Sequence, residues 1–176
     1  MTDSYFKTLD TSSKSFLILA KDEKHATKRR SYSIAVMINS WVLLEAYINN
    51  LSEILSKAKI ESHERALLLD RELKLKEDGT FTEIRSHSPT LKRTLFILRR
   101  FSSVDVEKFR ECKEWQNVQK CESIRNDLIH PKTITKKYLE HQITVKKAEK
   151  FRSDVLSFIK VINKKVLNKD IILDQT

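Results

Sequence analysis

The sequence has very little glycine and proline. One glycine (Gly79) and two prolines (Pro89 and Pro131) occur among its 176 residues. A fold rich in β-structure needs many tight turns, and these two residue types supply most of them. Their scarcity predicts long helices with short connections, in a chain long enough to bury a substantial core.

Cysteine and long apolar runs are also scarce. Cys112 and Cys121 lie nine positions apart, a spacing that suits neither a zinc knuckle nor a disulfide framework. The chain has no HExxH motif, no paired Asp-x-Asp and no glycine-rich phosphate loop, so we expect neither a metal nor a cofactor. No apolar run approaches the roughly 20 residues of a membrane span, and the polar N-terminus lacks the layout of a signal peptide. We therefore expect a soluble, cytoplasmic protein.

Charge is plentiful, and most of it is positive. Lys and Arg total 34 against 24 Asp and Glu, which gives a formal net charge of +10. A field of that sign favours polyanions, of which nucleic acid is the commonest, although solubility alone is an alternative explanation. The basic residues crowd the C-terminal third, where we expect most of them to form one charged face along a helix: Lys132, Lys136, Lys137, Lys146, Lys147, Lys150, Arg152, Lys160, Lys164, Lys165 and Lys169.

The hydrophobic pattern predicts an all-α fold, a single up-and-down helical bundle of five to six helices in one domain over residues 1–176. Ser88 with Pro89, the stretch 102–105 and Thr144 are expected to start helices. Residues 80–87, after the Asp78-Gly79 turn signal, are expected to be irregular. The expected helices cover about residues 3–23, 27–58, 61–76, 89–101, 106–129 and 144–167.

Two charged residues fall on otherwise apolar helix faces. At about 100° per residue, Arg125 lies in the middle of the apolar sector of its helix, and Glu45 lies inside the apolar stripe that also contains Trp41. An arginine cannot shed its charge and is costly to bury alone. We therefore predict that Glu45 and Arg125 pair across the bundle, unless one or both reach its end and meet water. Trp41 is expected to pack in the core.

The segment after Arg125 combines an amide with an imidazole. Pro131 disfavours a helical conformation at His130, so the helix is expected to end at or just before His130. Asn126, four residues earlier, would neighbour it on the surface. Such a set suits RNA cleavage, in which the imidazole takes the 2′-hydroxyl proton and the guanidinium stabilises charge on the phosphate. The attacking oxygen belongs to the substrate, so this chemistry requires no metal.

These residues resemble the motif of the HEPN family (higher eukaryotes and prokaryotes nucleotide-binding domains), in which Arg and a polar residue precede His by a few positions. The stretch RNDLIH supplies Arg125, Asn126 and His130, and SWVLLEAYINNLSE is similar to the family's long second helix, with Glu45 in it. The resemblance implies catalytic roles for Arg125, Asn126 and His130 and a supporting role for Glu45. It also implies a metal-independent endoribonuclease that leaves a 2′,3′-cyclic phosphate and a 5′-hydroxyl.

The same resemblance implies RNA as substrate, a homodimer with two motifs facing one cleft, and a toxin, phage-defence or RNA-processing role. A cognate antitoxin or a nucleotidyltransferase-like partner would fit that setting. Some family toxins carry a modified tyrosine two positions after the histidine, where this chain has Lys132. Lys132, Lys136 and Lys137 follow the motif and either steer RNA through its phosphates or only help solvation.

Two other functions stay open at the level of sequence. The first is a non-catalytic member of the family, a dimeric helical module that binds nucleotide, nucleic acid or a protein partner and keeps the motif for its architecture. The second is a basic bundle that binds duplex DNA, although the sequence shows no helix-turn-helix signature.

Overall fold

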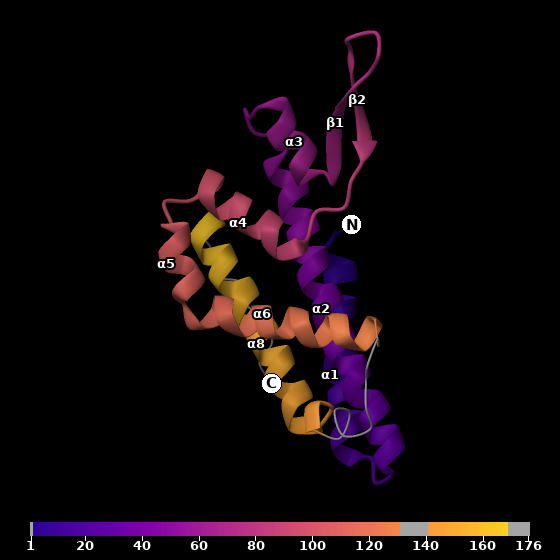
Figure 1. Ribbon diagram of the computed structural model, residues 1–176. Coiled ribbons are helices and arrows are strands. Elements are labelled where there is room, and N and C mark those ends of the chain that lie inside the picture. The colour runs from indigo at the N-terminus through magenta and orange to yellow at the C-terminus, as the bar shows by residue number, and fades with distance from the viewer. Residues whose placement is uncertain (1, 131–140, 169–176) are drawn as a thin grey trace.

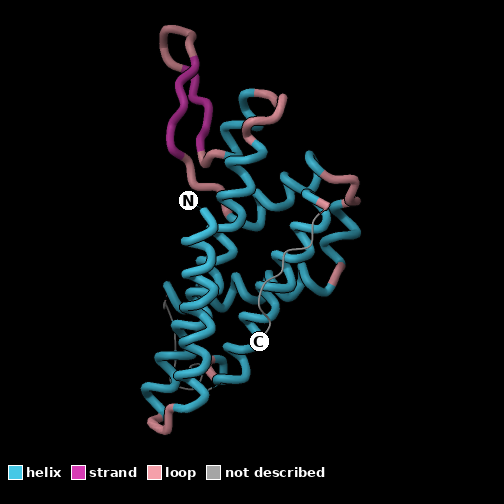
Figure 2. The backbone as a smooth tube through the Cα atoms, turned by 180° about the vertical axis from the view of Figure 1, so that it is seen from behind, coloured by secondary structure: helices cyan, strands magenta, loops and turns pink. Residues whose placement is uncertain are grey.

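The structure, a computed structural model, describes residues 2–130 and 141–168 and is mainly helical (Figure 1). This confirms the predicted helical bundle, to which the structure adds one small hairpin of two strands (Figure 2). The elements are α1 (Thr2–Asp22), α2 (Ala26–Leu55), α3 (Ser62–Leu68), β1 (Arg71–Leu75), β2 (Phe81–Arg85), α4 (Thr90–Phe101), α5 (Val106–Glu111), α6 (Lys113–Ile129) and α8 (Val145–Leu167).

The long helix α2 is the centre of the bundle. Helix α1 packs along it, α8 packs against both α2 and α6, and α6 crosses the middle of α2 (Figure 1). The predicted apolar stripe of α2 is largely buried, and Trp41 is only 2% exposed. The apolar positions of α8 face the same core, because their three-four spacing places them on one side of the helix. Those of them that are buried are Ala148, Phe151, Val155, Leu156, Phe158, Ile159 and Ile162.

Helix α2 is also the most apolar helix that the structure describes. By length and composition alone α2 could cross a membrane, although no membrane-spanning segment is expected from the sequence. Half of its most apolar window is buried by the other helices, as in the core helix of a soluble protein.

The expected fifth helix is divided into two. Asp105 caps α5 as the sequence predicts, since its carboxylate accepts the backbone N–H groups of Glu107 and Lys108 at 3.1 and 3.3 Å. The helix then ends at Glu111, because Cys112 adopts an extended conformation with ψ of 152° and becomes the residue before α6. The continuous helix predicted up to residue 129 is therefore wrong, whereas its C-terminal end is right.

The expected third helix is confirmed only in its first half, and the expected irregular stretch is wrong. Helix α3 ends at Leu68, and Asp70 then takes a left-handed backbone with φ of 52°, which a helix cannot continue through. The chain instead forms the antiparallel strands β1 and β2, with Leu73 opposite Glu83 at the centre. The Asp78-Gly79 pair lies in the hairpin loop, where Gly79 has φ of 78°, a value that glycine adopts without strain.

Of the two helix starts expected before α4 and α8, one is confirmed and the other is shifted by one residue. Thr144 caps α8 through its side chain, as predicted, but Pro89 rather than Ser88 is the residue before α4. Arg152 does not belong to the basic face that we expected on α8. It is buried and pairs with Asp10 at 2.6 Å, since the α1 side of α8 is covered.

Candidate active site at the end of helix α6

Arg125 of α6 and Glu45 of α2 form an ion pair where the two helices cross. Nη2 of Arg125 lies 3.2 Å from Oε1 of Glu45, and the two side chains are 26% and 27% exposed. The pairing predicted from two charges on apolar faces is therefore confirmed. The low exposure strengthens the contact, because little water screens the two charges.

Trp41 holds the carboxylate in place. Its indole N–H donates to the same Oε1 atom of Glu45 at 2.7 Å. The two residues are four positions apart on α2, so the indole lies one helical turn before the carboxylate on the same face. Trp41 is buried as predicted, but its polar atom also belongs to the site, which the helical pattern alone did not reveal.

Asn126 binds the other side of the guanidinium. Its side-chain oxygen accepts Nη1 of Arg125 at 3.0 Å. The third nitrogen, Nε of Arg125, is buried and has no hydrogen-bond partner among the described residues. Leaving this buried charged donor unpaired costs stability.

His130 follows the last residue of α6. The helix ends at Ile129, and His130 has φ of −119° and ψ of 68°, so the predicted end of the helix is confirmed. The backbone N–H of His130 donates to the carbonyl of Asn126 at 2.8 Å. Asn126 thus contacts Arg125 through its side chain and His130 through its backbone. Both Asn126 and His130 are exposed, whereas Arg125 is half-buried.

Glu122 is a member of the cluster that sequence reasoning missed. It lies one turn before Arg125 on α6, and burial raises the pKa of its carboxyl above the ordinary value of 4.5. Arg125 opposes this shift in the pKa and Glu45 adds to it. The spacing of three residues between Glu122 and Arg125 was a usable signal, because such residues share a helix face.

The described charges around Arg125 are mostly negative. A hollow of about 360 Å³ borders Glu45, and its only charged lining residues are Glu45 and Glu53. A phosphate group would be repelled on that side, so the anion-binding side of the cluster is expected at Asn126 and His130. The predicted RNA-binding residues Lys132, Lys136 and Lys137 lie outside the described residues.

The larger hollows lie away from this cluster. One of about 930 Å³ is lined by residues of α5 and α8 with the loop after α4, and one of about 710 Å³ lies at the base of the hairpin. Within residues 2–130 and 141–168, no group of three or more His, Cys, Asp or Glu side chains is placed to hold a metal ion.

Comparison with protein-family models, with curated proteins and with solved structures gave no match to this chain.

Proposed function

We propose that the protein is a metal-independent endoribonuclease of the HEPN type. The observation that supports this most is that a paired guanidinium (Arg125), an amide bonded to it (Asn126) and an exposed histidine (His130) all occupy the C-terminal end of one helix. Cleavage by the ribose 2′-hydroxyl needs a base, for which His130 is the candidate, and a cation that stabilises charge on the phosphate, for which Arg125 is the candidate.

In the proposed mechanism His130 takes the proton from the 2′-hydroxyl. The 2′-oxygen then attacks the adjacent phosphorus, and the bond from phosphorus to the 5′-oxygen breaks. The leaving oxygen takes up a proton, so the products are a 2′,3′-cyclic phosphate and a 5′-hydroxyl. Arg125 offsets the charge that grows on the phosphate oxygens, and Asn126 holds Arg125 in position. Glu45 fixes the guanidinium from behind.

The biological role and partners that we propose are those that the resemblance to the HEPN family implies. RNA is the substrate, two copies act together in the cytoplasm, and the role is that of a toxin, a phage-defence protein or an RNA-processing enzyme. A cognate antitoxin or nucleotidyltransferase-like partner would control it. Because Glu45 and Glu122 bring negative charge close to Arg125, RNA binding would need the cations of residues 132–137.

The test is cleavage of single-stranded RNA by the purified protein in EDTA. His130→Ala is expected to slow cleavage by at least about 100-fold, the usual contribution of a general base. His63→Ala removes an exposed histidine from α3 and is the matched control, expected to cleave like the wild type. Equal cleavage by wild type, His130→Ala and Arg125→Ala would indicate a contaminating nuclease and refute the proposal.

A second candidate is the non-catalytic dimeric module. It is favoured by the half-burial of Arg125, because a charge paired with Glu45 at a helix crossing also serves architecture alone. This candidate predicts that Arg125→Ala lowers thermal stability while the wild type cleaves no RNA. Cleavage that depends on His130 would exclude it.

A further inference from the structure

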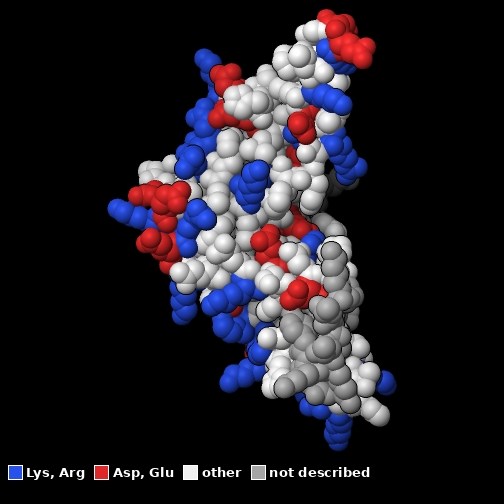
Figure 3. Space-filling view, viewed as in Figure 1, with Lys and Arg blue, Asp and Glu red and all other residues white. Residues whose placement is uncertain are grey.

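A hollow of about 410 Å³ lies between the starts of α2 and α8. Figure 1 shows both helices beginning at the lower end of the molecule, and Figure 3 shows Lys and Arg side chains around this end. The lining includes the buried residues Ser33 and Ile143. Within the described part of the chain, its charged lining residues are three cations, Arg29, Arg30 and Lys146.

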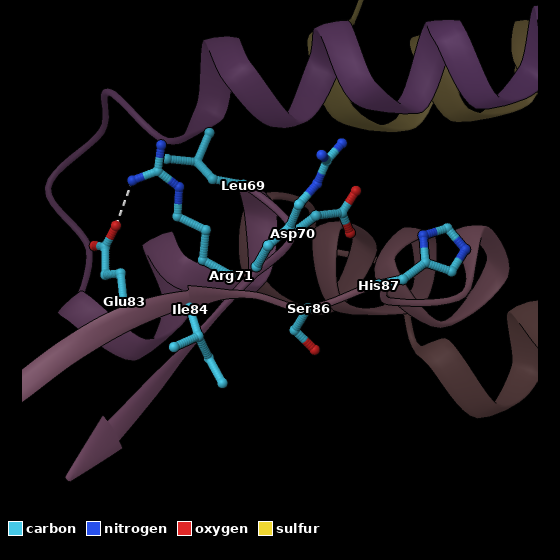
Figure 4. Close-up of a pocket in the computed structure, with 8 residues that line it drawn as sticks. Leu69, Asp70, Arg71, Glu83, Ile84, Ser86 and His87 are labelled. Atoms are coloured by element: carbon cyan, nitrogen blue, oxygen red, sulfur yellow. Dashed lines mark hydrogen bonds and ion pairs between the residues drawn. The ribbon is translucent and has the colours of Figure 1, made fainter. Parts of the chain in front are cut away.

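Other hollows of the described chain include carboxylates as well as cations. The two larger hollows and the one beside Glu45 do so, as does one between α1 and α8 that is lined by Glu149. At the base of the hairpin, for example, the guanidinium of Arg71 points to the carboxylate of Glu83 (Figure 4). The chain thus supplies its own counter-charge in those hollows. Among the described residues that line the hollow between α2 and α8, no carboxylate does this, so its potential is positive.

Arg30 differs from the other arginines that are buried or half-buried in the structure. Three of them each pair with a carboxylate from a distant part of the chain: Arg93 with Asp70, Arg125 with Glu45 and Arg152 with Asp10. Arg30 is half-buried too, yet it has neither an ion pair nor a hydrogen bond with any residue that the structure describes. A guanidinium cannot lose its charge and is costly to bury alone. An anion from outside the chain would supply the acceptor.

The two other cations of the hollow also keep donors available. Nη2 of Arg29 donates to the backbone carbonyl of Lys24 at 3.3 Å, which leaves its other N–H groups for a ligand. Lys146 is exposed and forms no ion pair with a described residue. Arginine presents a planar set of donors that binds two oxygens of a phosphate at once, and lysine adds a point charge. Two arginines with one lysine therefore suit a phosphate group.

The backbone adds to the positive potential that these side chains create. Neither α2 nor α8 has an acidic residue in its first turn, and His25 gives α2 no side-chain cap. The partial positive charge of both helix starts is therefore not offset by their own residues. Two carboxylates of the neighbourhood have other partners: Glu23 accepts the backbone N–H of His25 at 2.8 Å, and Glu149 pairs with Lys21 at 2.6 Å.

We propose that this hollow binds a phosphate group, which Arg29, Arg30 and Lys146 hold. A free phosphate compound and the backbone of single-stranded RNA share this chemistry, and the experiments below distinguish the two sources. None of the three residues belongs to the cluster around Arg125. The site is therefore separate from the proposed catalytic residues, and it binds phosphate whether or not the protein cleaves RNA.

The first measurement is the Tm of the protein in increasing sodium pyrophosphate at constant ionic strength. The wild type is expected to gain about 4 °C at ten times the Kd, because a ligand that binds only the folded state stabilises it. Arg30→Gln/Lys146→Gln should lose most of this gain. Without pyrophosphate the double variant should be at least as stable as the wild type, since it removes cations from the first turns of two helices. A merely structural role of the two cations would lower that baseline Tm instead.

The second measurement is the binding of labelled single-stranded RNA, followed by fluorescence anisotropy in EDTA. Every protein in this series carries His130→Ala, so that the proposed cleavage does not interfere and binding is measured alone. Adding Arg30→Gln/Lys146→Gln is expected to weaken RNA binding at least about tenfold. The slope of log Kd against log salt concentration should fall by about two, one for each phosphate contact that is lost.

The matched control is Lys92→Gln/Arg99→Gln, which removes one lysine and one arginine from exposed positions of α4. It lowers the net charge by the same amount and should respond to pyrophosphate and RNA like its parent protein. Weaker RNA binding by Arg30→Gln/Lys146→Gln than by this control would assign the hollow to RNA. Loss of the pyrophosphate response alone would assign it to a free phosphate compound. The proposal is overturned if the two double variants behave alike in both measurements, or if the wild type binds neither probe.

Discussion

The guanidinium of Arg125 and the carboxylate of Glu45 meet at 3.2 Å where α6 crosses α2, although 80 positions separate them in the sequence. The carboxylate oxygen that accepts Arg125 also accepts the indole N–H of Trp41. One oxygen atom therefore joins a core side chain to the candidate catalytic arginine. This arrangement fixes Arg125 before any substrate arrives, which is a property of preorganised sites.

Glu45→Ala is expected to lower the free energy of unfolding by about 1–3 kcal/mol, because it leaves a half-buried arginine and a buried indole N–H without their acceptor. Glu45→Gln keeps an acceptor and should cost less. Chemical denaturation measures both. Glu53→Ala removes an exposed carboxylate from the same helix and serves as control. A Glu45→Ala protein as stable as the control would show that the ion pair contributes nothing to the fold.

Asp70→Ala is expected to destabilise the protein by about 2–4 kcal/mol, since Arg93 is 4% exposed and would keep a buried charge without its partner. Asp70→Asn should cost less, because asparagine tolerates the left-handed backbone and retains an acceptor for Ser88. Thermal unfolding of both variants measures this order, with the exposed Asp22→Asn as control. The reverse order would mean that an amide NH2 beside the guanidinium of Arg93 costs more than the left-handed backbone and the Ser88 contact gain.

The interior helices were predictable because their apolar spacing is regular over several turns. The pair of Glu45 and Arg125 was predictable for a related reason, since each charge interrupts an apolar face that must otherwise be buried. The indole bond of Trp41 was not, because a tryptophan on a core stripe gives no indication of where its N–H points.

The hairpin was missed because its strands are short and exposed on both faces. Alternation in β1 extends over only Leu73, Lys74 and Leu75, and the leucines before it continue a helical pattern. The Asp78-Gly79 pair is a strong hairpin signal when strands flank it, and we read it only as a helix end. The break at Cys112 left no such signal, since neither glycine nor proline marks it.

The two cysteines are expected to react at very different rates with iodoacetamide. Burial raises the pKa of the Cys121 thiol to about 12, and its sulfur contacts the carbonyl of Phe151. At pH 8 only about one Cys121 thiol in ten thousand would be the reactive thiolate. Cys112 is half-buried between α5 and α6. Mass spectrometry of the native protein should therefore find the label on Cys112 first.

The same reagent provides the control for this prediction. In denaturant both thiols are exposed, and the two cysteines should be labelled at similar rates. Equal labelling in the native protein would mean that α6 opens from α8 often enough to expose Cys121.

Glu122→Gln is expected to stabilise the protein slightly near pH 7. Burial raises the pKa of the Glu122 carboxyl in the folded chain, while the unfolded chain titrates near the ordinary 4.5. The folded state therefore binds this proton more tightly, and the ionised carboxylate lowers stability above the folded pKa. That loss of stability fades as the pH falls toward 4.5. The stabilisation by glutamine should therefore be largest near pH 7 and disappear toward pH 4.5. Its size is expected to be about 1 °C in Tm, because water still screens the side chain.

The pH dependence separates this cause from any other effect of the substitution. A packing or helix-propensity effect of glutamine would persist at every pH, whereas a desolvation effect disappears once the wild-type carboxyl is protonated in both states. Glu111→Gln, at an exposed position of α5, makes the same chemical change. Its Tm difference from the wild type should be the same at pH 7 and pH 4.5. A Glu122→Gln protein that is less stable than the wild type at pH 7, with a deficit that shrinks toward low pH, would mean that Arg125 stabilises this carboxylate more than burial destabilises it.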